Sequence, residues 1–423
     1  MKEITYKDLQ LKIEIDFETS IKRDIDRTFV DTEDKISINI QEERHFYNLI
    51  KYAIDMEAHQ NVTSIINRII KKLNLKNITI KFYLYQDDSF NVNCFSRKIE
   101  AKINELYIFV SQHFFNNLNE DEQVAIIGHE ISHQLFNHFK YPTANILNLD
   151  LDVNTVGDLK HNLIYRSKIS EITSDLIGLA SCNFNSKAYS TALIKHTTGL
   201  FDNSSNEFGI SSLIDMVLVQ YDKFSNDPFM YDLQSTHPLL PLRVKIVNEI
   251  IDTDLIKYFG KSVSNSNYIK YKSDFNTRIN EIIKTIYPEI FPDKDDSNDV
   301  LILMSIAIVL ADGIIDDGEI KYMKSLFKKS HKTYTEYMRI IYAQKDGDYT
   351  KLINTLIKKC LRITKKKSFE KNMIIPIIRK LILVSASDGT IRKAELDVIF
   401  KFAKNFSITK RDIVLIISTQ YKV

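Results

Sequence analysis

The sequence predicts an α+β domain followed by a separate all-α domain. Apolar and polar residues alternate in several short segments near the N-terminus, which is the period of half-buried strands. Between and after these segments the apolar spacing is helical. Residues 299–423 have helical spacing throughout, with only four glycines to interrupt it. We therefore expect a small mixed sheet packed with helices, and then a helical module.

The composition is that of an ordinary globular protein. The chain has 423 residues, of which 44% are hydrophobic and 26% charged. Its 57 basic and 55 acidic residues leave a net charge of +2, which argues against nucleic acid or an anionic membrane as partner. Cys94, Cys182 and Cys360 are far apart and odd in number, so they predict neither a disulfide framework nor a cysteine metal site. A reducing compartment fits best.

Targeting and membrane signals are absent from the sequence. The first residues mix charge into every few positions and lack the apolar core of a signal peptide. The longest largely apolar run, Val300 to Ala311 with Ser305 inside it, has 12 residues. That is short of the roughly 20 needed to span a bilayer. We expect a cytoplasmic protein without an integral membrane segment.

The strand and helix patterns follow in order along the first half of the chain. Alternation at 9–17 and 36–40 predicts an N-terminal β extension. Helical spacing covers 41–75, and strand patterns return at 78–85 and 106–110. These segments supply the predicted sheet and its first helices.

A capped helix begins after the last of these strands. Asn119 is an N-cap residue, and Glu122 stands at the third helical position, as in a capping box. We expect this helix to run through His138. A second long helical pattern covers 163–182, and further helices extend to about residue 256.

The capped helix contains a zinc-binding signature, HExxH. His129 and His133 are four residues apart and therefore lie on one helix face, where both imidazoles can bind one cation. Glu130 is angled to reach a water on that cation. His138 follows five residues after His133, about 140° around the helix, so we expect it to point away from the metal.

Glu171 is the expected third ligand. It lies 38 residues after His133, with Asp175 one turn later on the same helix face. A ligand and a second carboxylate at that spacing can bind the metal and orient a ligating imidazole together. Two histidines, one glutamate and water leave the open coordination position that a catalytic zinc needs.

These residues resemble the gluzincin peptidases that include HtpX, the CaaX prenyl proteases and the BepA-like and Oma-like enzymes. The family pattern matches HEISH at 129–133, EITSD at 171–175 and STHPLLPLR at 235–243. The resemblance covers about 60–250 and implies a zincin-like metallopeptidase fold. It includes an edge segment, FNVNCFSRK, where in the family an extended substrate is thought to pair.

Two features depart from the family pattern. Ser174 stands where the family usually has alanine, a change that should leave ligation intact. Many relatives carry transmembrane helices, which this sequence lacks. Their membrane-protein substrates are therefore not carried over to this chain.

The resemblance implies peptide hydrolysis. The cation would lower the pKa of its bound water toward about 7 and polarise the scissile carbonyl. Glu130 would take the water proton and deliver it to the departing amine. The resemblance places His237 close to the metal, either as an oxyanion stabiliser or as a fourth ligand that shuts the resting site. We expect Arg243 to pair with a carboxylate near the site, and Asp175 is one candidate.

The C-terminal segment contains a repeat with a spacing of 76 residues. Aligning its copies pairs Asp312 with Asp388 and Glu319 with Glu395. Gly313 and Gly389, which follow the two aspartates, suit left-handed helix ends.

The repeat resembles TerB-like domains of the tellurite-resistance group, whose acidic residues are proposed to bind a divalent cation. The four acids above are thus a candidate second metal site. The alternative is that the acids are helix caps. Asp316 and Glu319 fit a capping box in the first copy, whereas in the second copy Arg392 stands at the cap position. The alternating ligands of an EF-hand are lacking.

We divide the chain into four parts: an N-terminal β extension at 1–40, a zinc metallopeptidase domain at 41–258, a linker with one helix at 259–298, and a TerB-like domain at 299–423. The leading hypothesis is a zinc-dependent endopeptidase acting on a protein or peptide. Its TerB-like domain would recruit it or bind a regulatory partner. The alternative is a non-catalytic metal-binding interaction protein in a stress or defence assembly.

Overall fold

The computed structural model describes most of the chain, and nothing below concerns the remaining residues. The described residues are 1–28, 44–86, 92–100, 103–141, 143, 153–200, 209–226, 235, 237–287, 290, 296–313, 323, 349–366, 368–369, 371–387 and 389–420. They form two compact units, the first mainly from residues 1–283 and the second mainly from 284–423. None of the described helices is both long and apolar enough to cross a bilayer.

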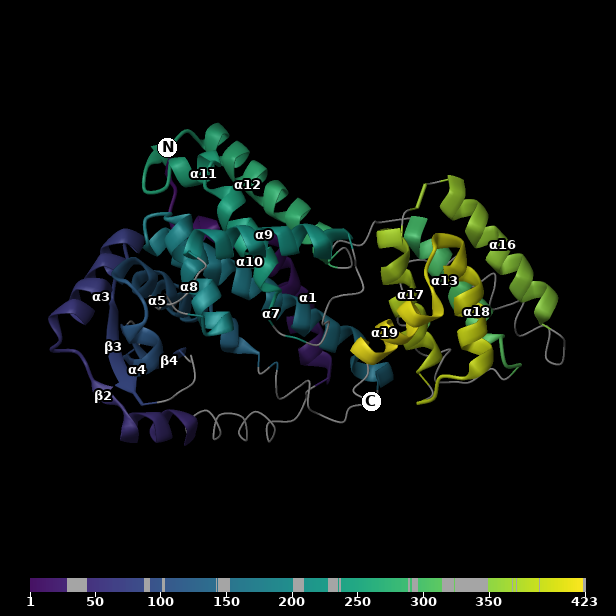
Figure 1. Ribbon diagram of the computed structural model, residues 1–423, viewed down its shortest axis with the longest axis horizontal. Helices are drawn as coiled ribbons and strands as arrows, with labels where there is room; N and C mark the ends of the chain where they lie inside the picture. Colours follow the sequence, from purple (N-terminus) through teal and green to yellow (C-terminus); the bar gives the residue numbers. More distant parts are fainter. Residues whose placement is uncertain are drawn as a thin grey trace. The chain divides into compact units, whose positions relative to one another are not determined.

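The first unit contains a four-stranded sheet (Figure 1). Its strand order is β2 (Ile54–Asp55), β3 (Ile78–Tyr85), β5 (Ile103–Ser111) and β4 (Val92–Glu100). Strands β3 and β5 are parallel, whereas the other pairs are antiparallel. The strands predicted at 78–85 and 106–110 are confirmed, and β4 lies at an edge of the sheet.

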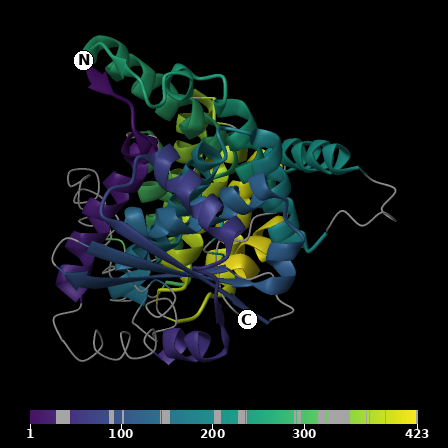
Figure 2. The ribbon, with the colours of Figure 1, turned by 90° about the vertical axis from the view of Figure 1, so that its left-hand side faces the viewer.

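Both faces of this sheet are covered. On one face, Phe82 packs against Phe115 with ring centroids 5.3 Å apart. On the other face, Tyr83 and Phe109 form an aromatic cluster with Phe46, which belongs to the helix of residues 44–52. Figure 2 shows the sheet as a layer between this helix and the larger group of helices. Alternate side chains of β3 thus pack in opposite directions, as the pleat of a strand requires.

Besides the helix of residues 44–52, ten α-helices lie in the described part of the first unit. Those that build the site are α1, α5, α7, α8 and α10. The bounds are α1 (Lys12–Thr28), α3 (Gln60–Leu73), α4 (Gln112–Asn116), α5 (Glu120–Leu135), α7 (Val153–Ser181), α8 (Ser186–Thr198), α9 (Ile210–Asn226), α10 (Leu240–Ile250) and α11 (Asp254–Lys257), with α12 (Asn265–Ile286) following at the unit's end.

Helix α5 begins with the predicted capping box. The side chain of Asn119 accepts a hydrogen bond from the backbone N–H of Glu122, at 3.0 Å, and Oε2 of Glu122 accepts one from the backbone of Asn119, at 2.9 Å. Near the other end of the helix, Gln134 donates to the backbone oxygen of Cys94 on β4, at 3.1 Å. The helix is therefore fixed at its start by its own cap and near its end by the edge strand.

Two glycines allow α5 and α7 to approach closely. A Cβ atom at Gly128 on α5 would lie 2.2 Å from Oγ of Ser181. A Cβ atom at Gly178 on α7 would lie 2.4 Å from the ring of Tyr189 and 2.6 Å from the backbone oxygen of Ala125. Any larger residue at either position would push these helices or α8 apart.

The N-terminal segment is helical, and the strand predicted at 9–17 is wrong. A 3₁₀ turn, η1 (Tyr6–Leu9), leads into α1. The buried positions Leu11, Glu14 and Ile21 follow a helical period, and Ile15, which alternation would have buried, is 47% exposed. The charged residue Glu14 lies on the buried face of the helix and interrupts the helical period of apolar residues in the sequence. The strand predicted at 36–40 lies outside the described residues.

Helix α12, the helix expected within 259–298, holds the N-terminal segment in place. Tyr268 donates to Oδ1 of Asp8, at 2.7 Å, and Lys272 donates to the backbone oxygens of Asp8 and Gln10. A two-residue strand, β1 (Lys2–Glu3), also pairs with β6 (Ser262–Val263). The first and last segments of the unit therefore lie together.

The described part of the second unit is entirely helical, as predicted. Its core surrounds α13, in which Val300 to Val309 are buried and, except for Ser305, apolar. Gly313 and Gly389 have φ of 78° and 92°, the left-handed conformation predicted for these helix ends. The helices are α13 (Asp296–Val309), α16 (Thr350–Lys366), α17 (Lys371–Ser385), α18 (Lys393–Ala403) and α19 (Lys410–Gln420).

Candidate metal centre

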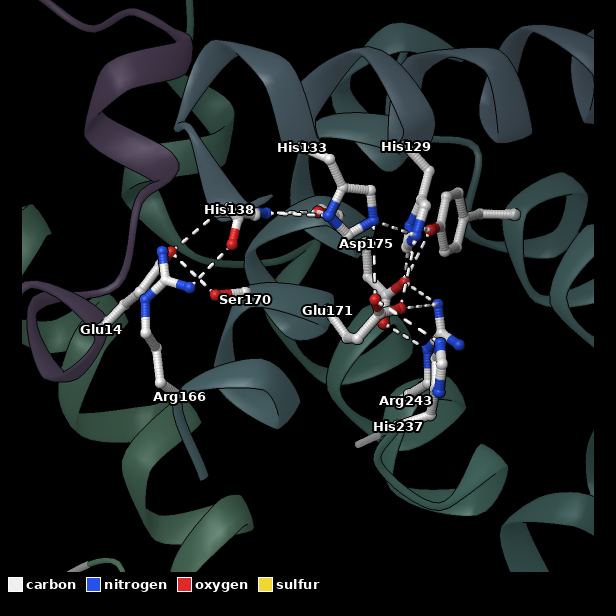
Figure 3. Close-up of polar contacts among 12 residues, drawn as sticks. Glu14, His129, His133, His138, Arg166, Ser170, Glu171, Asp175, His237 and Arg243 are labelled. Carbon is white, nitrogen blue, oxygen red and sulfur yellow. Dashed lines mark hydrogen bonds and ion pairs between the residues drawn. The ribbon is translucent and has the colours of Figure 1, made fainter. Parts of the chain in front are cut away.

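Three side chains from two helices converge in the first unit (Figure 3). Nε2 of His129 and Nε2 of His133, both on α5, are 3.2 Å apart. The carboxylate of Glu171 on α7 lies 3.5 Å from each of these nitrogens. Two ligand atoms bound about 2.0–2.1 Å from a tetrahedral zinc are separated by about 3.3 Å. The three groups therefore fit a zinc ion in both donor type and spacing.

The outer side of His129 contacts Asp175. Nδ1 of His129 is 3.1 Å from Oδ1 of Asp175 and 3.0 Å from the hydroxyl of Tyr189. Tyr189 in turn donates to the same carboxylate oxygen, at 2.7 Å. A proton on Nδ1 directs the lone pair of Nε2 toward the metal position, so Asp175 selects the tautomer that can bind a metal.

Arg243 on α10 neutralises this group of acids. Its Nε and Nη2 donate to the two oxygens of Asp175, at 2.8 and 2.6 Å, and Nη2 is 3.6 Å from Glu171. Burial by itself would raise the pKa of Asp175 and lower that of Arg243. The ion pair outweighs burial in both cases, so the pKa of Asp175 is lowered and that of Arg243 is raised. Both groups are therefore held in their charged forms.

The two imidazoles differ in their electrostatic surroundings. Burial, with the charge of His129 adding to it, lowers the pKa of His133 well below its usual value, so His133 is neutral, as a ligand must be. Burial also opposes the charge of His129, but hydrogen bonds to Asp175 and Glu171 raise its pKa to about 9. A metal that binds here must therefore displace a proton from His129.

Glu130 faces a cavity beside the three ligand groups. The cavity has a volume of about 600 Å³ and is lined by Glu130, by Val92 to Phe95 of the edge strand, and by Phe46 and Phe139. Burial, followed by the charge of Glu171, raises the pKa of Glu130 to about 7, although His129 and Arg243 oppose the shift. A carboxyl group with that pKa can both accept and return a proton at neutral pH.

His237 lies at the rim of the cavity. Its side chain is 67% exposed, and its Nε2 is 3.8 Å from Oε1 of Glu171. It stands two residues before Leu239, the N-cap residue of α10. The described geometry brings His237 near the ligand groups without joining them.

His138 does not continue α5, so the expectation that it points away from the metal ligands is wrong. The helix ends at Leu135, and Asn137 adopts a left-handed conformation with φ of 53°. The chain then turns back, and Nδ1 of His138 lies 3.0 Å from Nδ1 of His133. This reversal occurs without a glycine, and it adds a third histidine, His138, to the cluster of His129 and His133.

Other residues around the cavity lack a signal in the sequence. Tyr189 contacts both His129 and Asp175 but belongs to no spaced motif. His196, also on α8, lines the cavity, and burial lowers its pKa to about 4. Only the packing of α8 against α5 brings these two residues to the site.

The C-terminal acids are in part accounted for by other contacts. Asp312 pairs with the guanidinium of Arg392, and Glu395 accepts a hydrogen bond from the backbone N–H of Arg392, at 2.6 Å. Glu319 and Asp388 lie outside the described residues. Within the described part of the chain, the one group of three candidate metal ligands is His129, His133 and Glu171.

Comparison with known proteins finds a family model that matches part of the first unit. Residues 57–251 match the model of peptidase family M48. No curated protein and no solved structure matches the chain. The matched residues include the three candidate ligands and Arg243, and they exclude α1 and the second unit. The site and the match together support a metallopeptidase domain of the gluzincin type at residues 57–251.

Proposed function

We propose that the protein is a zinc-dependent endopeptidase. The observation that carries this proposal is the triangle of His129, His133 and Glu171 with a neighbouring carboxyl group, Glu130, facing a cavity. A protein that only stores zinc needs no such carboxyl group and no open side. A hydrolase needs both.

Zinc bound by these groups would supply Lewis-acid chemistry, lowering the pKa of water in its open position and polarising a peptide carbonyl. Glu130 takes the proton from the attacking water, because its pKa near 7 suits both steps of the reaction. It then returns the proton to the departing amine. Asp175 holds His129 in the ligating tautomer throughout.

His237 is the proposed donor to the oxyanion that forms on the carbonyl oxygen. Its position at the rim, 3.8 Å from Glu171, leaves it within reach of a substrate in the cavity. A donor placed there acts on charge that develops in the transition state. The alternative role, in which His237 closes the resting site as a fourth ligand, predicts the opposite effect of its removal.

The proposed substrate is an extended segment of a protein or peptide. Strand β4 lies at the edge of the sheet, and its residues Val92 to Phe95 line the cavity. An extended peptide can pair with the backbone groups of such an edge. The scissile bond would then lie between the edge strand and the helix that carries Glu130.

The second unit is proposed to be a TerB-like domain that recruits or regulates the peptidase. Support for this comes from its helical structure and from the two left-handed glycines, Gly313 and Gly389, at equivalent positions of the repeat. A divalent cation bound by its acids remains a prediction. We also propose a cytoplasmic location, with which the three free, buried cysteines are compatible.

Metal analysis combined with a peptide-cleavage assay tests the function. We expect one zinc per chain, lost in His133→Ala. Glu130→Gln should retain zinc but lower the cleavage of an unfolded casein substrate by about 10²–10⁴-fold. Asp121→Asn is a matched control, since Asp121 lies on the same helix and pairs with Arg68. Zinc binding without any cleavage by the unaltered protein would favour the non-catalytic alternative.

A further inference from the structure

Glu14 of α1 is a buried carboxylate directed at the metal centre from outside the matched peptidase region. Its side chain is 0% exposed. It accepts hydrogen bonds from Thr173, at 2.7 Å, and from Ser170, at 3.1 Å, both on α7. Its Oε1 lies 2.8 Å from Nε2 of His138. No part of the proposed mechanism uses this charge, although burying it is costly.

His138 lies between Glu14 and a candidate metal ligand. Its Nδ1 is 3.0 Å from Nδ1 of His133, which is the ring nitrogen of His133 that faces away from the other ligands. The hydroxyl of Ser174 lies 3.4 Å from Nδ1 of His133 and 3.3 Å from Nδ1 of His138. Figure 3 shows Glu14, His138 and His133 in one line leading to the site.

The order of contacts determines where the protons lie. His133 can bind a metal through Nε2 only if its proton is on Nδ1. That N–H needs an acceptor. The facing Nδ1 of His138, at 3.0 Å, is nearer than the hydroxyl of Ser174, at 3.4 Å, so the lone pair of His138 is the better acceptor. The proton of His138 is then on Nε2, on the side of the ring that faces the carboxylate of Glu14. The N–H is bent away from a direct line to Oε1, so the attraction is mainly electrostatic.

The opposite tautomer of His138 would be unfavourable. Its Nε2 lone pair would lie 2.8 Å from a buried carboxylate oxygen, and its Nδ1–H would oppose the N–H of His133. Burial raises the pKa of Glu14, but contacts with His138, Thr173 and Arg166 outweigh burial and lower it, so the carboxylate is ionised. The charge of Glu14 therefore acts on His133 through one intervening ring.

The backbone around this chain of contacts is also fixed. Arg166 on α7 donates to the backbone oxygen of His138, at 2.8 Å, and to Oε1 of Glu18 on α1, at 3.0 Å. One buried guanidinium thus joins the turn after α5 to the N-terminal helix. The position of His138 relative to Glu14 does not depend on an exposed loop.

We propose that Glu14 and His138 are positioning residues that hold His133 in its metal-binding tautomer, and that α1 is therefore a functional part of the metal centre. This inference rests on the metal site of the proposed function. Asp175 acts directly on His129, whereas Glu14 acts on His133 through His138. Each ligand imidazole is then oriented by its own carboxylate, one from α7 and one from α1.

The first test reads the protons directly. In zinc-loaded protein labelled with ¹⁵N-histidine, long-range ¹H–¹⁵N spectra should show His133 protonated at Nδ1 and His138 protonated at Nε2. A His138 ring protonated at Nδ1 alone would overturn the proposal. Spectra of His138→Ala and His133→Ala proteins assign the signals.

The second test measures zinc affinity by competition with a chromogenic chelator. Glu14→Ala and His138→Ala should weaken zinc binding by about 10–100-fold. His138→Asn should restore most of the affinity, because its Oδ1 can accept the Nδ1 proton of His133. Glu14→Gln should lose less than Glu14→Ala, since its amide oxygen keeps the position but not the charge.

Asp16→Asn is the matched control, because Asp16 lies on the same helix as Glu14 but is exposed to solvent. Thermal unfolding of the zinc-free proteins shows whether a variant that binds zinc weakly is still folded. If Glu14→Ala does not fold, the zinc affinities of His138→Ala and His138→Asn are compared instead. Wild-type affinity in folded His138→Ala would refute the proposal. None of these measurements uses a substrate, so a protein that binds zinc but cleaves no peptide would refute only the proposed function.

Discussion

Arg243 and Asp175 form a two-point ion pair across 68 residues of sequence, with N–O distances of 2.8 and 2.6 Å. The pair joins the first turn of α10 to the C-terminal part of α7, directly behind His129. Its geometry is that of a guanidinium fork on a carboxylate, which a lysine cannot reproduce. The pair thus fixes one of the metal ligands from behind.

Arg243→Met should therefore destabilise the protein by about 3–5 kcal/mol, because it leaves the buried charge of Asp175 without its partner. Urea unfolding of the metal-free protein measures this loss. Arg278→Met is a suitable control, since the side chain of Arg278 is 43% exposed and pairs with Glu249. Equal losses of unfolding free energy in the two variants would contradict the argument that the buried ion pair matters more than the exposed one.

Gly178→Ala should destabilise the protein by about 1–3 kcal/mol, because the added methyl group meets the ring of Tyr189 and the backbone of α5. Zinc affinity should fall with it, since Tyr189 contacts both His129 and Asp175. The matched control is Gly209→Ala, where a Cβ atom would meet nothing within 4 Å. A neutral Gly178→Ala variant would mean that α5 and α7 can separate freely.

His196→Leu should make the protein less sensitive to acid. The folded-state pKa of His196 is about 4 against an ordinary 6.5, so between these values the unfolded chain binds a proton that the folded protein does not. Stability falls as pH decreases through this range, by up to about 3 kcal/mol. Urea unfolding of metal-free protein from pH 7 to pH 4 should give a shallower slope for the variant. Parallel curves would count against this assignment.

His237→Ala distinguishes the two roles considered for this residue. If His237 donates to the oxyanion, kcat should fall by about 10²–10³-fold, with zinc affinity and KM little changed. Cleavage of a fluorogenic peptide measures kcat and KM, and chelator competition measures the zinc affinity. A rise in activity would instead show that His237 closes the resting site.

Much of the metal centre could be predicted from the sequence because its signals are local. The spacing of His129 and His133, with the capping box at Asn119, depends on one helix and its start. The edge position of β4 was implied by the family resemblance. In each case the information lies within a few consecutive residues or a known motif.

The remaining residues of the site could not be predicted, because their positions depend on contacts between distant segments. Glu14 occupies the buried face of α1, where a charged residue made the helix resemble a strand. His138 reaches His133 only because α5 ends three residues earlier and the chain reverses at Asn137. Tyr189 comes from a third helix with no motif. A polar residue that a site requires on the buried face of a helix interrupts the apolar periodicity from which secondary structure is predicted.

The placement of Glu14 has a consequence for how this protein can evolve. The N-terminal helix lies outside the region that matches the peptidase family model. A chimera that joins this peptidase core to a different N-terminal segment would bury the imidazole of His138 without the carboxylate of Glu14. With the role proposed for Glu14, the N-terminal helix and the residues it contacts would be inherited together, and a change at position 14 would select for compensating changes at positions 138 and 174.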